Sequence, residues 1–329
     1  MTFAEHIRIK IPAILKAFFG LAVFICADYS IYYLFRFFGW DREIYKGLFN
    51  TLACVVVFVA MLVVNKISAK LDAPLIKIGK LSPDQVAALI IIGFGMLGFV
   101  STYIGIADKI SEYFAPVGEA VEEYRENVDR YSEVEQITVP LWDSLLYAFT
   151  LSFFVPITEE MSFRGVIFGE LRKGFGPWLS VIISAIIFGV LHGVSIHIGY
   201  AIVCGIIIAS IYHLTGSLIS SIILHMVFNI FGSGLQNVCE LEQLNVPDEL
   251  YVKIFITLNT ATILFMPIAV VAFAYLVHVK RKKDAKQKEL AEYIAAREAE
   301  KAAQADEENT DELETPGSPD TSTATEAEE

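Results

Sequence analysis

The sequence predicts an all-α membrane protein, a polytopic transmembrane helical bundle of about eight spans with a disordered acidic C-terminal tail. Three observations support this prediction. The 329 residues are 55% hydrophobic and only 19% charged, and the mean hydropathy of +0.54 exceeds that of a water-soluble domain of this length. Apolar runs of about 20 residues, the length that crosses a bilayer, recur along the chain. After residue 283 the composition becomes rich in Ala, Glu and Lys and then in Thr, Pro and Ser.

The predicted spans follow the apolar runs in order. They are residues 13–35, 47–64, 86–107, 148–171, 177–195, 198–214, 216–235 and 254–279. Because almost no chain joins the fifth, sixth and seventh spans, we expect these three to form an antiparallel series of neighbouring helices. Residues 66–83 mix apolar side chains with four lysines, which is typical of an amphipathic segment on the bilayer surface or of a plain basic loop. Residues 108–140 are acidic and polar, and we expect a short helical cap outside the bilayer.

Lysine and arginine residues near the span ends predict the orientation in the membrane. With the N-terminus in the cytoplasm, thirteen of them lie on the inner side and seven on the outer side, as the positive-inside rule favours. We therefore expect a multi-pass protein of the cell membrane with both termini in the cytoplasm. The bilayer itself is then one partner of the chain, whereas a net charge of -13 argues against a nucleic-acid partner.

The C-terminal tail accounts for most of that charge. Residues 284–329 contain 15 acidic and 4 basic side chains, with too few large apolar side chains to build a core. We expect residues 284–304 to be helical and 305–329 to be disordered. The predicted domain organisation is an N-terminal membrane region (1–140), a catalytic core (141–235), a last span with its basic stop (236–283) and the acidic cytoplasmic tail (284–329).

Ionisable side chains within the spans identify the candidate functional site, because each costs about 2.5–3.5 kcal/mol to insert and usually serves function. In the fourth span Glu160 and Arg164 are four residues apart, the acid-first spacing that pairs on one helical face. Glu159 points about 100° away around the helix and is free of that pair. Two further pairs are Phe188 with His192 in the fifth span and His225 with Asn229 in the seventh. All three spans start or end at the same predicted cytoplasmic face, so their polar groups can meet inside the bilayer.

At these residues the sequence resembles the CPBP family of intramembrane proteases, which includes the type II CAAX prenyl endopeptidases. The family is recognised by Glu-Glu-x-x-x-Arg, Phe-x-x-x-His and His-x-x-x-Asn motifs on successive helices. They are present in order as Glu159-Glu160-x-x-x-Arg164, Phe188-x-x-x-His192 and His225-x-x-x-Asn229. The resemblance covers residues 148–235 and leaves the first three spans, the last span and the tail outside it. It implies an endopeptidase for a peptide or lipidated protein substrate in the membrane, cleaved at a membrane-associated or C-terminal, CAAX-like segment.

Peptide hydrolysis assigns a role to each of these residues. Glu159 is the candidate base that activates water, and His192 can orient the same water. His225 and Asn229 can donate hydrogen bonds to the tetrahedral oxyanion. Glu160 and Arg164 form a structural ion pair that fixes the helix. In an alternative mechanism His192, His225 and a glutamate hold a catalytic Zn²⁺, and the sequence leaves both open.

The sequence also bears on other protease classes and on other functions. The chain contains no His-Glu-x-x-His, Gly-x-Gly-Asp or Gly-x-Ser-Gly motif, which argues against the site-2, aspartyl and rhomboid types of intramembrane protease. A non-catalytic bacteriocin immunity or scaffold protein of the same family would keep these residues but act by binding. A transporter would use the carboxylates as ion sites, but the spans show no inverted repeat.

Overall fold

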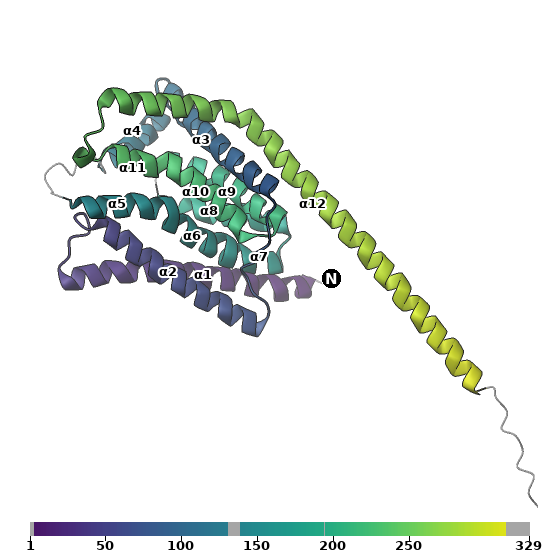
Figure 1. Cartoon of the computed structure of the whole chain (residues 1–329). Coiled ribbons are helices and arrows are strands. Elements are labelled where there is room, and N and C mark those ends of the chain that lie inside the picture. The colour runs from purple at the N-terminus through teal and green to yellow at the C-terminus, as the bar shows by residue number, and fades with distance from the viewer. Residues whose placement is uncertain (1–2, 131–138, 194, 314–329) are drawn as a thin grey trace, which may run out of the picture. The chain divides into compact units, whose positions relative to one another are not determined.

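The computed structural model describes residues 3–130, 139–193 and 195–313 of the chain. Within these residues, seven helices are long and apolar enough to cross a membrane. They are α1 (Phe3–Phe38), α2 (Lys46–Leu71), α3 (Pro83–Ser111), the α5–α7 helix (Leu141–Gly174), α9 (Ser195–Thr215), the α10–α11 helix (Leu218–Cys239) and α12 (Asp248–Leu313) (Figure 1). These helices confirm the predicted all-α, multi-pass membrane protein.

The fifth predicted span corresponds to a shorter apolar helix, α8 (Pro177–Val190). Its 14 residues extend ~21 Å, which is less than the ~30 Å of hydrocarbon in a bilayer. The predicted run to residue 195 continues past the helix end into a turn in which Gly193 has a φ of +79°, a conformation that glycine adopts without strain. The helix therefore ends before His192.

Two of the long helices are interrupted by wider π turns. The α5–α7 helix consists of α5 (Leu141–Phe149), η1 (Thr150–Phe154), α6 (Val155–Glu159), η2 (Glu160–Ile167) and α7 (Phe168–Gly174). The α10–α11 helix consists of α10 (Leu218–Asn229), η3 (Ile230–Gly234) and α11 (Leu235–Cys239). Such π turns occur frequently at functional sites, and here η2 begins directly after Glu159 and η3 directly after Asn229.

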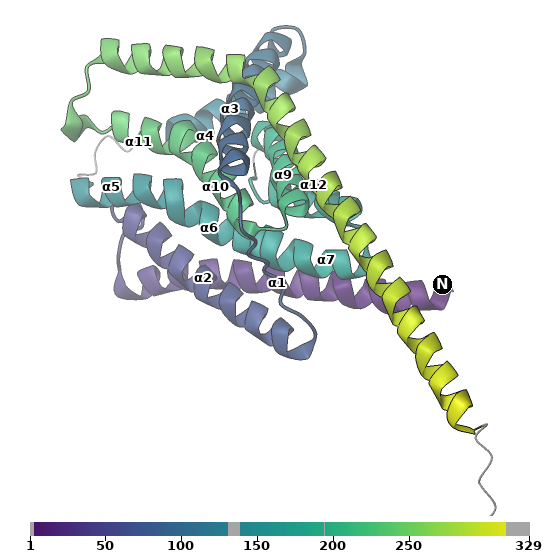
Figure 2. The ribbon, with the colours of Figure 1, turned by 45° about the vertical axis from the view of Figure 1, so that its right-hand side comes forward.

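Helix packing places the α5–α7 helix near the centre of residues 1–277. It contacts α1 and α2, while α10 packs against α3, and α8, α9 and α10 pack in sequence order (Figure 2). That order agrees with the predicted series of neighbouring helices. The buried side chains of Phe163, Leu171 and Phe188 join α1, the α5–α7 helix, α8 and α9 in one hydrophobic cluster.

The described connections between the long helices include two short helices and one non-helical segment. α4 (Ala115–Arg130) forms the helix expected within residues 108–140, and η4 (Glu242–Leu244) precedes α12. Residues 72–82 have no helix. Instead, the Asn65 side chain accepts hydrogen bonds from the backbone N–H groups of Leu75 and Ile76, and Leu75 is buried. This segment is therefore non-helical and is attached to the protein at Leu75 and Ile76.

The chain divides into two compact units, residues 1–277 and 278–329. In the second unit the helix continues to Leu313, past residue 304 where we expected it to end, and Lys280 pairs with Asp284 one turn further on. Residues 314–329 lie outside the described part of the chain. The division into domains at residues 140, 235 and 283 stays a prediction.

Candidate active site

The two adjacent glutamates lie at the junction between α6 and η2 and have different surroundings. Glu160 is fully buried, and its Oε1 accepts a 2.8 Å hydrogen bond from Nη1 of Arg164, which is also fully buried. Glu159 keeps 22% of its side chain exposed and borders a cavity. The predicted ion pair is therefore formed, and Glu159 remains outside it.

Arg164 is held on three sides. Besides its bond to Glu160, its Nη2 donates to the backbone oxygen of Gly205 at 3.4 Å. Its guanidinium carbon lies 4.4 Å from the centroid of the Phe188 ring, a cation–π contact that is favoured where both groups are desolvated. The ion pair thus connects the α5–α7 helix to α8 and α9.

His225 on α10 lies between the two carboxylates. Its Nδ1 is 2.8 Å from Oε1 of Glu160, and its Nε2 is 3.8 Å from Oε2 of Glu159. Sequence reasoning placed Glu160 only in the pair with Arg164. The structure adds this second contact, which fixes the orientation of the imidazole.

His192 lies in the turn after α8. Its Nδ1 is 2.8 Å from the backbone oxygen of Phe188. Since a carbonyl oxygen only accepts, Nδ1 carries the proton, and in the neutral ring Nε2 has a free lone pair. The Phe188 ring packs against the imidazole edge to face, with 4.6 Å between ring centroids. The Phe-x-x-x-His motif therefore sets both the tautomer and the position of the imidazole.

Asn229 is the last residue of α10, and its amide reaches the α5–α7 helix. Its Nδ2 donates to the backbone oxygen of Leu151 at 2.9 Å. In η1 the N–H of Val155 bonds to the oxygen of Thr150, so the next donor in this π register would be residue 156. That residue is Pro156, which has no N–H. Asn229 thus bonds a carbonyl that the helix leaves without a donor, and its second Nδ2 hydrogen stays available.

One cavity of about 550 Å³ brings four of the six predicted residues together. Its walls include Glu159, His192, His225 and Asn229, whereas Glu160 and Arg164 lie behind the wall. The four lining groups come from α6, the turn after α8, and α10. The sequence motifs, separated by tens of residues, therefore form one site that combines a carboxylate, two imidazoles and an amide.

The cavity also includes residues that sequence reasoning did not select. His197 was left out because it lies near a span end, yet it borders the cavity. Its ring centroid is 4.6 Å from that of His192, and it stacks on Tyr200 at 4.7 Å. Residues of α3 and α12, among them Ser101 and Asn259, complete the wall. Spacing after the Phe-x-x-x-His motif would suggest His197, but no local pattern indicates the α3 and α12 residues.

The alternative mechanism requires a zinc site formed by His192, His225 and a glutamate. Among the residues that the structure describes, no set of three or more His, Cys, Asp and Glu side chains is arranged to hold a metal ion. His225 approaches Glu159 and Glu160. The described side chains therefore do not fit the alternative zinc site of His192, His225 and a glutamate.

Comparison with known proteins finds one similarity, which covers part of the chain. Residues 141–231 match a family model described as type II CAAX prenyl endopeptidase Rce1-like. No curated protein and no solved structure gives a significant match to the chain. The matched segment contains all six predicted site residues and indicates a protease, as the resemblance implied. Within this multi-pass membrane protein, residues 141–231 are therefore similar to the type II CAAX prenyl endopeptidase Rce1-like family.

Proposed function

We propose that this protein is an intramembrane endopeptidase in which Glu159 activates a water molecule for attack on a peptide bond. The supporting observation is the single cavity bordered by Glu159, His192, His225 and Asn229 inside the Rce1-like domain. A carboxylate, a hydrogen-bond acceptor and hydrogen-bond donors around one cavity are the groups that amide hydrolysis requires.

Glu159 and His192 act first. The carboxylate of Glu159 borders the cavity and is not committed to Arg164, so it can take one proton from water. The free Nε2 of His192 accepts a hydrogen bond from the other proton and thereby orients the molecule. The water oxygen then forms a bond to the carbonyl carbon of the substrate, and the carbonyl oxygen becomes the oxyanion.

Asn229 and His225 stabilise that oxyanion. Asn229 donates its second Nδ2 hydrogen, because the first is given to Leu151. His225 donates from Nε2 when the ring is doubly protonated, since its Nδ1 hydrogen is given to Glu160. The protonated Glu159 then passes its proton to the leaving nitrogen and the C–N bond breaks. The products are a carboxylic acid and an amine, and Glu159 is again a carboxylate.

The substrate in this proposal is a membrane-associated peptide or a lipidated protein with a CAAX-like C-terminal segment. The family description names CAAX prenyl endopeptidases, and the cavity walls include apolar side chains such as Leu97, Phe255 and Leu258. Such walls favour an extended, uncharged segment. Both termini lie in the cytoplasm in this proposal, so the site is reached from the cytoplasmic side of the cell membrane.

Cleavage of a reporter peptide by the purified full-length protein in nanodiscs tests the proposal. Glu159→Gln should abolish turnover, whereas Glu170→Gln should retain it once correct folding is verified. Glu170 is a matched control because it lies on the same long helix, pairs with Lys173 and does not border the cavity. Equal turnover by Glu159→Gln and wild type would remove Glu159 from the mechanism. Substrate binding without cleavage by wild type would favour the immunity or scaffold alternative.

A further inference from the structure

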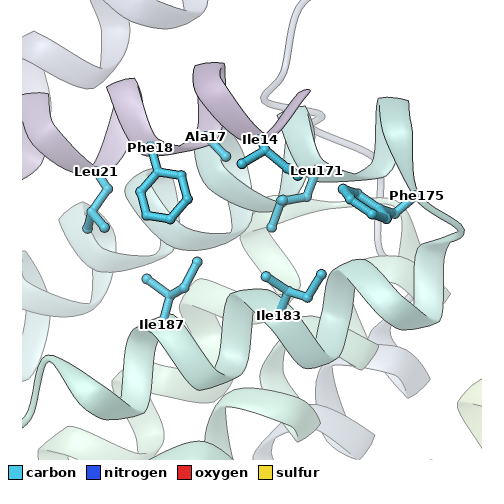
Figure 3. Close-up of a pocket in the computed structure, with 8 residues that line it drawn as sticks. All are labelled: Ile14, Ala17, Phe18, Leu21, Leu171, Phe175, Ile183 and Ile187. Carbon is cyan, nitrogen blue, oxygen red and sulfur yellow. The ribbon is translucent and has the colours of Figure 1, made fainter. Parts of the chain in front are cut away.

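A second cavity, of about 230 Å³, lies between α1, the end of α7 and α8 (Figure 3). All its lining side chains are apolar: Ile14, Ala17, Phe18, Leu21, Leu171, Phe175, Ile183 and Ile187. None of them borders the candidate active site. In Figure 3 the α1 side chains face Ile183 and Ile187 of α8 across the opening. We call this cavity the α1–α8 groove.

The lining of the groove suits a hydrocarbon chain. A polar site is needed to retain water, whereas a dry apolar cavity of about 150 Å³ takes up a molecule such as benzene. The lining positions from Ile14 to Leu21 extend ~10 Å along α1. Phe18 at the edge of the groove is 58% exposed, so a chain can enter sideways from the bilayer without passing through water.

A cation lies at one end of the groove. Lys10 is four residues before Ile14, so both are on the same face of α1. Its Nζ lies 5.6 Å from the centroid of the Phe175 ring, which belongs to the groove lining. The described residues include no carboxylate that pairs with Lys10. The groove therefore runs from an unpaired ammonium group near the start of α1 to apolar side chains deeper in the span.

A cation at one end of an apolar groove matches the chemistry of an anionic lipid, which has a negative headgroup and hydrocarbon chains. We propose that the α1–α8 groove binds one acyl chain of an anionic phospholipid from the bilayer, with the lipid phosphate on Lys10. The direction of the groove agrees with that of a bilayer lipid, because Lys10 is near the N-terminal end of α1, which is the end expected at the membrane surface. A neutral apolar ligand would make no use of the ammonium group, and a free phosphate would leave the apolar channel empty.

Lipid in this groove would support the wall behind the candidate active site. Ala17 and Leu171 line the groove and belong to the same buried cluster as Phe188. The Phe188 ring in turn contacts the imidazole of His192 and the guanidinium of Arg164. The binding claim stands without this connection and is independent of whether the protein cleaves peptides.

Photo-crosslinking measures the binding directly. The full-length protein is reconstituted in phosphatidylcholine nanodiscs containing phosphatidylglycerol with a diazirine on its acyl chain, and the labelled peptides are mapped by mass spectrometry. We expect labelling on α1 and α8 peptides. Ile183→Trp fills the groove and should lower this labelling about tenfold, equivalent to ~1.4 kcal/mol of binding free energy. Ile186→Trp is the matched control, because Ile186 is exposed on the same helix and does not line the groove.

The headgroup part of the proposal has its own variants. Lys10→Gln should reduce labelling by the phosphatidylglycerol probe to the level of a phosphatidylcholine probe, and Lys10→Arg should retain it. Because Lys10 is not in the buried core, this variant tests the site even if Ile183→Trp does not fold. Equal labelling of wild type by the two probes would overturn the role of Lys10. Unchanged labelling of a folded Ile183→Trp protein, or labels that map only to other helices, would overturn the lipid site.

Discussion

Glu160 holds His225 through a 2.8 Å hydrogen bond between its Oε1 and the Nδ1 of the imidazole, although 65 residues separate them. The same Oε1 accepts from Arg164. Because a carboxylate oxygen only accepts from these groups, the Nδ1 of His225 carries a proton and Nε2 is turned towards Glu159. Glu160 is therefore a positioning residue for His225 as well as the partner of a buried arginine, and its Oε2 and the Nε of Arg164 have no partner among the described residues.

The first prediction concerns this buried pair. Glu160→Gln should lower the free energy of unfolding by about 3–5 kcal/mol, because it leaves the Arg164 guanidinium buried without a counter-charge. The double variant Glu160→Gln/Arg164→Met should recover much of that stability, since neither charge is then buried. Turnover should stay low in both variants because His225 has lost its charged partner. Equilibrium unfolding in detergent and reporter cleavage measure the two effects. An unfolding free energy in Glu160→Gln equal to that of wild type would contradict this account.

The second prediction concerns the oxyanion donor. Asn229→Ala should lower kcat by about 10²–10³, the cost of removing one such donor, with little change in KM, because the contact forms only in the transition state. Asn237→Ala is the matched control. Its amide also donates to a backbone oxygen, that of Ser233 at 2.9 Å, but Asn237 does not border the cavity. A loss of the same size in both variants would show that the Asn229 effect is structural.

The third prediction concerns metal dependence. Treatment with a chelator such as 1,10-phenanthroline should leave reporter cleavage unchanged, because His192, His225 and the glutamates are not arranged as a ligand set. Elemental analysis of the purified active protein should find far less than one zinc per chain. Stoichiometric zinc that disappears in a His192→Ala/His225→Ala variant, together with activity lost on chelation, would reverse this preference and support the metalloprotease alternative.

Hydropathy and composition predicted most of the fold because crossing a bilayer imposes a length and an apolar composition on each helix. The structure adds local features that hydropathy and composition do not predict, namely where α8 ends and how residues 72–82 fold. The apolar run from residue 177 includes the turn at Gly193, so hydropathy overestimated the length of α8. Residues 72–82 contain basic and apolar side chains, but their structure depends on distant partners. Asn65 accepts from Leu75 and Ile76, and the Ser217 hydroxyl donates to the backbone oxygen of Gly79.

The candidate site was predictable to the extent that it depends on spacing within a helix. The four-residue interval predicted the bond between Glu160 and Arg164. The contact of Glu160 with His225 joins different helices, so no local period indicates it. The π turns were also beyond prediction, because a shift of one residue in the hydrogen-bond register leaves the apolar pattern almost unchanged. Pro156 is the one residue in the sequence that indicates an interrupted helix at this point. The hydrogen bond from Asn229 to the backbone oxygen of Leu151, which compensates for the missing N–H, is evident only from the structure.

The last prediction is that truncation after Lys283 leaves catalysis intact. The predicted site residues all lie before residue 235, and the hydrophobic cluster that includes α12 extends only to Val277. Every described side chain from 284 to 302 is exposed, so removal of these residues deletes no buried contact. Residues 280–283 are all basic, and in the proposed orientation we expect them to be enough to keep that end of the helix in the cytoplasm. In the proposed orientation we expect the tail to serve solubility of the cytoplasmic face or recruitment of a basic partner.

Reporter cleavage by the truncated and full-length proteins, at matched amounts in the membrane, checks this expectation. The two rates should agree within experimental error, because the tail contains no predicted site residue and its described side chains, at residues 284–302, are all exposed. A matched control keeps the tail but replaces its acidic residues from 284 to 302 with glutamine, which separates its charge from its length. A rate reduced more than about tenfold in the truncated protein, equivalent to ~1.4 kcal/mol in the barrier, would show that the tail supports the active conformation or delivers substrate. If the glutamine-substituted protein lost the same activity, the negative charge of the tail would be responsible.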